Sequence, residues 1–251
     1  MIRSLKELEN RTVQATDGQV GEVEDFYFDD DNWAVRYLAV DSKDWLGGQR
    51  LLFSPRAFGK LEAAGESLQV QVDRETIRSS PRFERNQPLR REQEIELHEY
   101  YQWPFYWTPG DAGGLGPGSI AAYPLVELAD EMMENSAAAP LDHHALHSAR
   151  DFIGFSIHAR DGSIGRVEDL IAEDEGWNIL YMIVDTGGWL PGRKVLVSPN
   201  WVQEIDWPAS QVQVDLSQET IRNSPEYDPS VPLDQEYETR LNRHYGKKRE
   251  R

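Results

Sequence analysis

The chain contains no cysteine among its 251 residues. This absence excludes disulfide bonds, thiolate zinc sites, cysteine-ligated iron–sulfur clusters and a cysteine nucleophile. The chain also lacks any run of about 18 uncharged apolar residues, so the sequence predicts no membrane-spanning helix. Its start, MIRSLKELENR, is charged throughout and lacks the apolar stretch of a signal peptide. We therefore expect a cytoplasmic protein without an integral membrane segment.

Basic residues are scarce. Lys and Arg number 26 against 44 Asp and Glu, which gives a formal charge of −18. Such a surface repels nucleic-acid phosphates and anionic lipid headgroups. We therefore expect no nucleic-acid partner, while a basic protein partner stays open. The terminal KKRER is the local exception, and we interpret it as a solvated tail rather than a binding arm.

A long internal repeat organises the chain. Residues 17–55 align without a gap on residues 161–199, so each position of the first copy is matched 144 positions later. The identical positions in the first copy are Asp17, Gly18, Gly21, Val23, Glu24, Asp25, Trp33, Tyr37, Val40, Asp41, Trp45, Leu46, Gly48, Ser54 and Pro55. The likeness extends to a trailing segment, in which Leu97 and Tyr101 match Leu241 and Tyr245. Two copies are too few for a solenoid, so the repeat indicates two similar domains.

Turn signals about ten residues apart divide each copy into short strands. In the first copy, strands are expected over 20–28, 33–40, 50–53 and 69–72, and a short helical turn over 75–79. The hydrophobic alternation shifts phase between Val23 and Phe26, which predicts a bulge. Short strands at this spacing indicate a small antiparallel barrel in each copy. A core of this size is marginal alone, so the sister copy or the helices are expected to complete it.

The expected fold is mainly β, with two small antiparallel barrels joined by an α-helical connector. Pro88–Tyr101 reads as a helix, an aromatic run YYQWPFYW follows at 100–107, and a second helix is expected over 124–132. The predicted divisions are a first barrel at 1–84, a helical and Gly/Pro-rich linker at 85–147, a second barrel at 148–228, and a C-terminal helix with a basic tail at 229–251.

Three linker histidines form the only metal-like cluster in the sequence. His143 and His147 are four positions apart and can share a helical face with His144 nearby, but no third ligand can be named. We interpret all three as solvated polar residues, with a metal as the alternative. The acidic run DDD at 29–31 lacks the ligand spacing of a calcium loop and predicts a solvated turn. No cofactor or metal is expected.

The paired acids Glu24–Asp25 and Glu168–Asp169 recur in both copies. Neighbouring strand residues point to opposite faces, so neither pair can form one acid–base dyad. We expect a solvent-facing carboxylate or a hydrogen bond to a neighbouring turn. The glycines at 113–118 do not form a P-loop, and no GxSxG nucleophile elbow is present. The sequence therefore predicts a protein that is not an enzyme.

Aromatic residues are the candidate partner-binding positions. Trp45 and Trp189 each precede a turn and an apolar strand, where they either plug one end of a barrel or form a loop contact. The aromatic run packs between domains or subunits, or offers part of itself to a partner. Its candidate residues are Trp103, Phe105, Tyr106 and Trp107.

With both copies aligned, the chain resembles a tandem PRC-barrel protein. The resemblance lies in DGQVGEVEDFYFD, RYLAVD and LLFSP, which recur as DGSIGRVEDLIAE, LYMIVD and VLVSP. It covers about two thirds of the chain, in blocks 1–84 and 148–228. It implies small β-barrels without catalytic residues of their own. The family includes the cytoplasmic domain of the photosynthetic reaction-centre H subunit and a barrel of a ribosome maturation factor, both of which mainly contact other proteins.

Three functions are weighed from the sequence. The first is a non-enzymatic bacterial protein-interaction or scaffold module with an unidentified protein partner, possible also as a homo-oligomer. The alternative is a peripheral accessory subunit of a photosynthetic or electron-transfer complex, similar to the H subunit. The third is an enzyme or small-ligand binder working between the barrels. The sequence leaves open whether the barrels pack on each other or on another chain.

Overall fold

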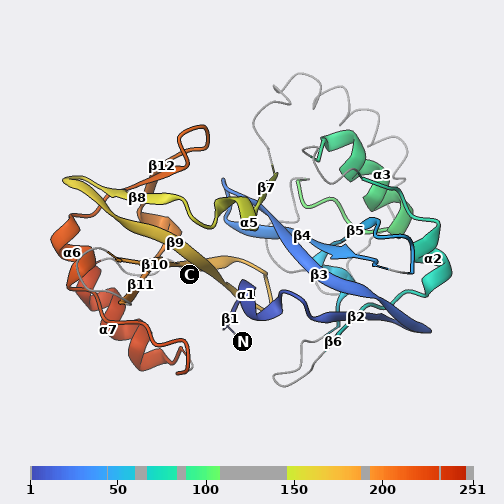
Figure 1. Ribbon diagram of the computed structural model, residues 1–251, viewed down its shortest axis with the longest axis horizontal. Coiled ribbons are helices and arrows are strands. Elements are labelled where there is room, and N and C mark those ends of the chain that lie inside the picture. Colours follow the sequence, from blue (N-terminus) through green and yellow to red (C-terminus); the bar gives the residue numbers. More distant parts are fainter. Residues whose placement is uncertain are drawn as a thin grey trace, which may run out of the picture.

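A computed structural model of the chain shows two β-sheets side by side (Figure 1). The fold class is confirmed: the protein is mainly β, with two repeats of similar topology and a helical connector. The structure describes residues 2–43, 45–59, 67–83, 89–107, 146–187, 193–231 and 233–246.

The first sheet has six strands in the order β5-β4-β3-β2-β6, with β7 pairing with β3 off this path. Its pairs are antiparallel except β2 with β6, which is parallel. The strands are β2 (Thr12–Ala15), β3 (Gly18–Asp29), β4 (Ala34–Asp41), β5 (Arg50–Phe53), β6 (Ser67–Gln69) and β7 (Leu146–Ser148).

The second sheet repeats this arrangement in the order β11-β10-β9-β8-β13-β12, and β1 pairs with β9 off the path. The pair of β8 with β13 is again parallel. The strands are β1 (Ile2–Ser4), β8 (Ser156–Ala159), β9 (Gly162–Glu173), β10 (Ile179–Asp185), β11 (Lys194–Val197), β12 (Val202–Asp206) and β13 (Gln211–Val214). Each sheet thus takes one strand from the other repeat.

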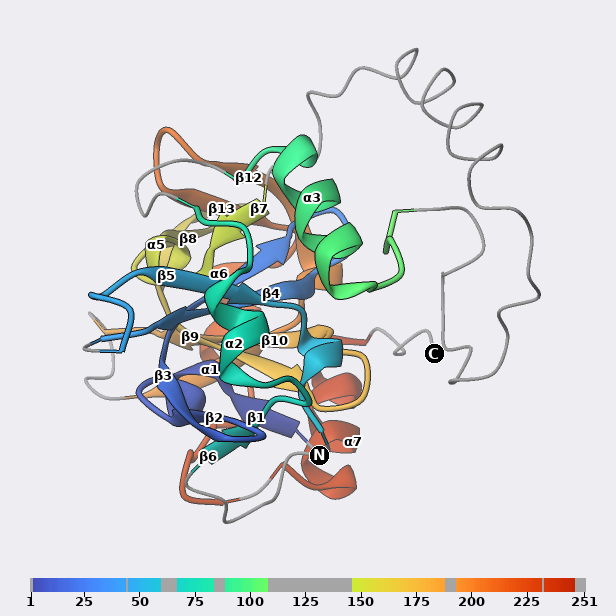
Figure 2. The ribbon, with the colours of Figure 1, turned by 90° about the vertical axis from the view of Figure 1, so that its right-hand side faces the viewer.

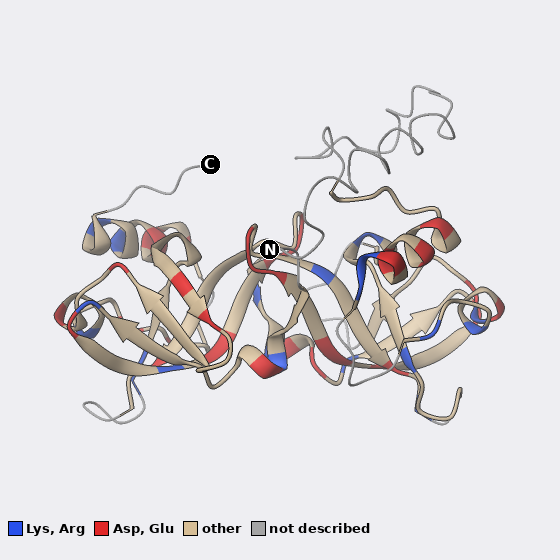
Figure 3. Cartoon of the chain, turned by 90° about the horizontal axis from the view of Figure 1, so that it is seen from above, with Lys and Arg blue, Asp and Glu red and all other residues tan. Residues whose placement is uncertain are grey.

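The helices are short and also occur in equivalent pairs. They are α1 (Leu5–Leu8) with α5 (Ala149–Phe152), α2 (Arg74–Arg78) with α6 (Gln218–Arg222), α3 (Arg91–Tyr101) with α7 (Gln235–Tyr245), and the 3-10 turns η1 (Pro55–Ala57) with η3 (Pro199–Trp201). Helix α3 lies over the first sheet (Figure 2). Seen from above, the molecule has two similar halves on either side of the N-terminus, with acidic residues in both (Figure 3).

Most of the expected elements of the first copy are present. The register of β3 with β4 shifts between Val23 and Asp25, which confirms the predicted bulge. The strand expected over 69–72 lies earlier, at β6, and Val70 forms only an isolated bridge with Phe58. The expected helix from Pro88 begins at Arg91. The helix expected over 124–132 lies outside the described residues.

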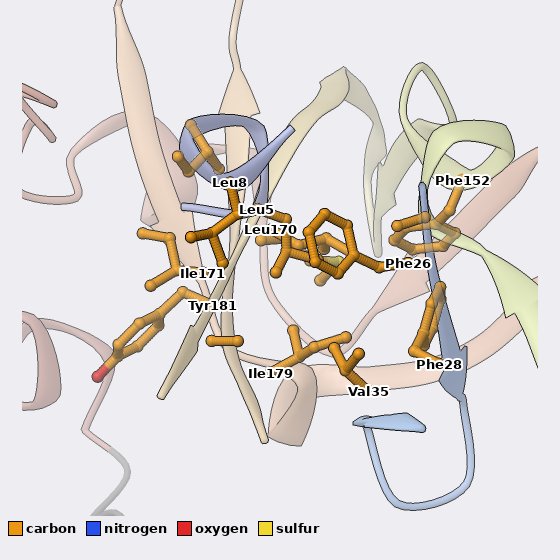
Figure 4. Packing of buried hydrophobic residues seen from close by; sticks show 14 of the residues in the cluster. Leu5, Leu8, Phe26, Phe28, Val35, Phe152, Leu170, Ile171, Ile179 and Tyr181 are labelled. Atoms are coloured by element: carbon orange, nitrogen blue, oxygen red, sulfur yellow. The ribbon is translucent and has the colours of Figure 1, made fainter. Parts of the chain in front are cut away.

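One hydrophobic cluster runs through both repeats. Leu5 and Leu8 of α1 lie with Leu170 of β9, while Phe152 of α5 lies with Phe28 of β3 (Figure 4). All five side chains are at most 2% exposed. Burying one such side chain stabilises the fold by about 1.5–3 kcal/mol. The expectation that the sister copy or the helices complete each small core is therefore confirmed.

Candidate functional site

Each repeat places its first residues on the sheet of the other repeat. Residues 2–8, called arm 1 here, pair through β1 with β9, and α1 contacts the same strand. Residues 146–152, called arm 2, pair through β7 with β3, and α5 contacts that strand. The two registers are equivalent under the offset of the repeat. The arms are therefore exchanged reciprocally, and the boundary expected between residues 147 and 148 falls inside β7.

A buried aspartate holds each arm. Asp25 accepts hydrogen bonds from Ser148 Oγ at 2.6 Å and from a backbone N–H of α5 at 3.1 Å. Asp169 accepts the equivalent bonds from Ser4 Oγ and from a backbone N–H of α1. Each serine also accepts a backbone N–H in the first turn of its own helix. The serine hydroxyl thus links the start of an arm helix to the opposite repeat.

The environment of these aspartates decides between the two roles expected for the paired acids. Asp25 and Asp169 are 3% and 5% exposed, so they do not face solvent, and each accepts a hydrogen bond from the first turn of an arm helix. Burial raises the pKa of both carboxyls, and the bonds from the arm serines and N–H groups act in the opposite direction. The turn that each aspartate bonds belongs to an arm from the distant half of the chain, which the sequence pattern did not identify.

The repeats also meet where β4 and β10 begin. The N–H of Val35 donates to the carbonyl of Trp177 at 2.8 Å, and the N–H of Ile179 donates to the carbonyl of Trp33 at 2.6 Å. Both tryptophans are in the left-handed region, with φ of 52° and 54°. This backbone conformation is uncommon for a bulky residue, and here it occurs at equivalent positions on both sides of the contact. The recurrence of Trp33 in the sequence is thus explained by the junction between repeats.

The repeated DGxxG motif has a structural role. Asp17 and Asp161 accept hydrogen bonds from the first N–H of α2 and α6, at 2.8 and 2.7 Å. A Cβ atom at Gly21 or Gly165 would lie only 2.0 or 2.2 Å from a backbone oxygen at the end of the neighbouring strand. No side chain fits at that distance. The motif therefore fixes a helix start and a close approach of two strands.

One polar contact differs between the two sides of the junction. In arm 1, Arg3 forms an ion pair with Asp174 at 2.9 Å. In arm 2, His147 occupies the equivalent place, 3.4 Å from Asp30, and its ring stacks on Trp207 with centroids 3.4 Å apart. Trp207 Nε1 also donates to Asp30 at 3.0 Å. Burial lowers the pKa of His147, while the nearby aspartates act in the opposite direction.

Of the three candidate histidines, the structure describes only His147, which belongs to β7. His143 and His144 lie outside the described residues. Within the described part of the chain, no group of three or more potential ligands is arranged to hold a metal ion. The turn at 29–31 is only partly solvated, because Asp29 is buried and accepts hydrogen bonds from Arg36 and two backbone N–H groups.

The aromatic run folds back on α3. Four of its rings surround His98, with centroids between 5.2 and 6.0 Å from the imidazole. These rings belong to Trp103, Phe105, Tyr106 and Trp107. All four residues are half-buried. The candidate partner-binding residues of this run therefore form one cluster within the first repeat.

The other two candidate tryptophans are placed less completely. Trp45 is half-buried and packs against the main core. The guanidinium groups of Arg74 and Arg78 lie 4.6 and 6.0 Å from its ring centroid. Arg74 and Arg78 are the first and last residues of α2, so Trp45 links its loop to this helix. Trp189 lies outside the described residues.

Sequence reasoning missed the two arms. A usable signal exists, because SLKE at 4–7 and SARD at 148–151 share the offset of the repeat and the spacing of a helix N-cap. Each predicts a short helix before the repeated strands. Neither segment identifies Asp169 or Asp25 as its partner, since that contact depends on how the repeats pack.

Comparison with known proteins gives one family. A family model described as PRC-barrel domain matches residues 2–76 and again residues 145–221. The matched ranges begin with the arms and end in α2 and α6, so α3, the aromatic run and α7 lie outside them. A search of curated proteins found no significant match. Among the described residues, none of the helices has the length and apolar character needed to cross a membrane.

Proposed function

The chain belongs to the PRC-barrel domain family and carries two copies of the domain, and we propose that it is a non-enzymatic protein-interaction or scaffold module. The proposal rests on the hydrogen bonds that carboxylates common to both copies make within the fold. Asp17 and Asp161 bond helix starts, and Asp25 and Asp169 bond the arms. Groups committed to holding the fold together support a structural role rather than acid–base chemistry.

The exchanged arms suit a scaffold. Independent domains joined by a linker reorient easily, because interfaces between domains are commonly modest in area. Here each arm adds a strand and a short helix with two buried apolar residues to the opposite repeat, and one hydrophobic cluster spans both repeats. The two barrels therefore present their outer faces at a fixed relative orientation. A partner that contacts both barrels would bind without having to order them first.

The α3 face of the first barrel is the proposed contact region. It joins α3 to the aromatic segment Gln102–Trp107, and both lie outside the ranges matched by the family. The equivalent helix of the second barrel, α7, is followed by GKKRER instead of aromatic residues. Tyr, Trp and Phe are enriched where proteins bind one another, so this difference favours the first barrel.

Two measurements test the proposal. Light scattering coupled to size exclusion on the full-length protein would first separate self-association from binding to another protein. Affinity capture from cells that make the protein would then compare the wild type with a variant carrying Trp103→Ser, Phe105→Ser and Trp107→Ser. A matched control, Val231→Ser, changes an exposed apolar residue of the second repeat.

We expect either a dimer or one stoichiometric protein partner for the wild type and the control, and a loss of that association in the aromatic variant. A monomer that captures no partner would count against the proposal. Recovery with a membrane-bound electron-transfer complex would instead support the accessory-subunit alternative.

A further inference from the structure

Helix α3 carries two buried polar residues toward the first sheet. Glu94 is 1% exposed and His98 is 2% exposed. Between them lies Tyr37 of β4, whose hydroxyl is 3.0 Å from Glu94 Oε2 and 2.7 Å from His98 Nε2. Tyr37 itself is fully buried. The three side chains form a chain of hydrogen bonds without access to water.

The direction of one hydrogen bond fixes the tautomer of His98. Its Nδ1 lies 2.9 Å from the carbonyl oxygen of Pro104. A carbonyl oxygen only accepts, so Nδ1 carries a proton. If the ring is neutral, Nε2 has no proton and must accept the hydroxyl proton of Tyr37.

The Tyr37 hydroxyl then has no proton left to donate to Glu94. The hydroxyl has one proton, which cannot serve Nε2 and the carboxylate together. An ionised Glu94 beside a neutral His98 would place two acceptors at hydrogen-bond distance from the Tyr37 oxygen with one proton between them. One added proton completes the chain, either on Glu94 as a carboxylic acid or on His98 Nε2 as an imidazolium.

We infer that Glu94 and His98 share one added proton through Tyr37, and that this proton holds α3 and the segment Gln102–Trp107 on the first barrel. The segment is tied to the same groups, because Pro104 accepts from His98, and Tyr106 donates to Glu94 at 2.6 Å. Four aromatic rings of the segment also contact the imidazole. Loss of the proton therefore weakens the helix and the segment together.

Burial favours the proton on Glu94 rather than on His98. Burial raises the pKa of Glu94, although Arg91 at 3.0 Å and Arg36 act in the opposite direction. Burial lowers the pKa of His98 to about 4, and the cations Arg56 and Arg91 add to this effect. Both directions point to a neutral acid beside a neutral imidazole.

The second barrel provides an internal comparison. The residues at the same offset are Tyr181, Glu238 and Asn242. Asn242 replaces His98 and does not titrate, so the proton-sharing chain belongs to the first barrel alone. Glu238→Gln is therefore a matched control for Glu94→Gln, with the same change at the same position of the equivalent helix.

The sign of the pH effect follows from proton counts. Burial raises the pKa of Glu94, so the stabilisation that its proton gives is present below the ordinary value of 4.5 and is lost as the pH rises through the folded pKa. Burial lowers the pKa of His98 to about 4, so the contribution of the neutral imidazole is present above pH 6.5 and is lost as the pH falls through about 4. Loss of the Glu94 proton therefore weakens the docking of α3 and the segment on the alkaline side.

Carbon-13 NMR of the full-length protein, labelled at the glutamate side-chain carboxyls, tests the proton directly. The resonance of Glu94 is identified by its absence in Glu94→Gln. We expect it to keep the shift of a neutral carboxylic acid at pH values above the ordinary range of a glutamate side chain. A Glu94 resonance that titrates within that ordinary range would overturn the inference.

Hydrogen exchange tests whether this proton holds α3 and the segment Gln102–Trp107 on the first barrel. The amide of Trp103 donates to the carbonyl of His98, so its protection reports docking of the segment. After correction for intrinsic exchange, we expect protection in the wild type and in Glu238→Gln to fall up to about tenfold per pH unit once Glu94 loses its proton. Glu94→Gln keeps a donor toward Tyr37 and is expected to stay level. If the protection of the Trp103 amide had the same pH dependence in Glu94→Gln and in the wild type, the proton would not be what holds the segment.

Discussion

Ser148 Oγ donates a hydrogen bond at 2.6 Å to the carboxylate of Asp25, 123 positions earlier in the chain. Ser4 makes the same bond to Asp169. These two contacts cross the junction in opposite directions, and each lies where an arm helix begins. They explain why an acid inside a strand recurs in both copies: each copy binds the arm of the other.

The first prediction concerns the coupling across this junction. Asp25→Ala leaves the Ser148 hydroxyl and an α5 N–H without their acceptor, so we expect a loss of about 2–3 kcal/mol in the free energy of unfolding. Ser148→Ala should cost less, about 1 kcal/mol, because it removes one hydrogen bond. In the double variant the two losses should not add, giving a coupling of about 1 kcal/mol in urea denaturation.

The cycle has two controls within the chain. Ser4→Ala with Asp169→Ala should show coupling of similar size, since the geometry is repeated on the other side. Glu204→Ala changes an exposed acid of β12 and should leave stability within about 0.5 kcal/mol. Strict additivity of the Asp25 and Ser148 losses would show that the arm bond contributes nothing.

The second prediction tests the close approach of strands at the DGxxG motif. Gly21→Ala would place a Cβ 2.0 Å from a backbone oxygen, so the strands must separate. We expect a loss of more than about 3 kcal/mol or failure to fold. Gly47→Ala is the comparison, because it lies at φ +67° with open space around the added Cβ. Its cost should be about 1 kcal/mol, measured by thermal and urea unfolding.

The third prediction concerns acid sensitivity. The folded pKa of His147 is lowered by burial, so the folded state binds fewer protons than the unfolded one. Its contribution to stability is present above pH 6.5 and is lost as the pH falls through the folded pKa. His147→Asn should reduce the slope of unfolding free energy against pH below this value. Burial also lowers the pKa of His98, to about 4, so His98 contributes a slope of the same sign that His147→Asn leaves in place.

Arg3 provides the contrast for that experiment. It occupies the equivalent place in arm 1 and stays charged across this range. Arg3→Lys should therefore leave the pH slope unchanged while lowering stability. A slope that is the same in His147→Asn and the wild type would remove His147 as the source of acid sensitivity.

Local patterns were enough to predict most strands of the first repeat but not the junction. The phase shift between Val23 and Phe26 predicts the bulge, because alternation and turn signals depend on neighbouring residues. The bond between Ser148 and Asp25 depends on packing of two distant segments, which no local pattern encodes. The contact between Tyr37 and His98, which are 61 positions apart, depends on tertiary packing in the same way. Sequence reasoning therefore found the repeat and its elements, but neither the arms nor the buried polar chain.

The last prediction separates two roles of the aromatic segment. Its rings pack around His98, so replacing Trp103, Phe105 and Trp107 with Ser removes support for α3 as well as aromatic surface. We expect the protection of α3 amides in hydrogen exchange to fall more than that of the strands, since none of the three residues is a buried member of the hydrophobic clusters, against which Trp103 packs half-buried.

A variant at Tyr100 separates the loss of an exposed aromatic ring from the loss of support for α3. Its side chain is 36% exposed, and it lies on α3 beside the segment. Tyr100→Ser removes an exposed ring and its hydrogen bond to the carbonyl of Thr76, but none of the ring contacts to His98. The amides of α3 should therefore keep more protection than in the triple variant. If this variant also loses its partner, the contact is made by the exposed face of the docked helix. If only the triple variant loses it, binding requires the docked segment itself. Partner retention in both variants would place the contact elsewhere on the molecule.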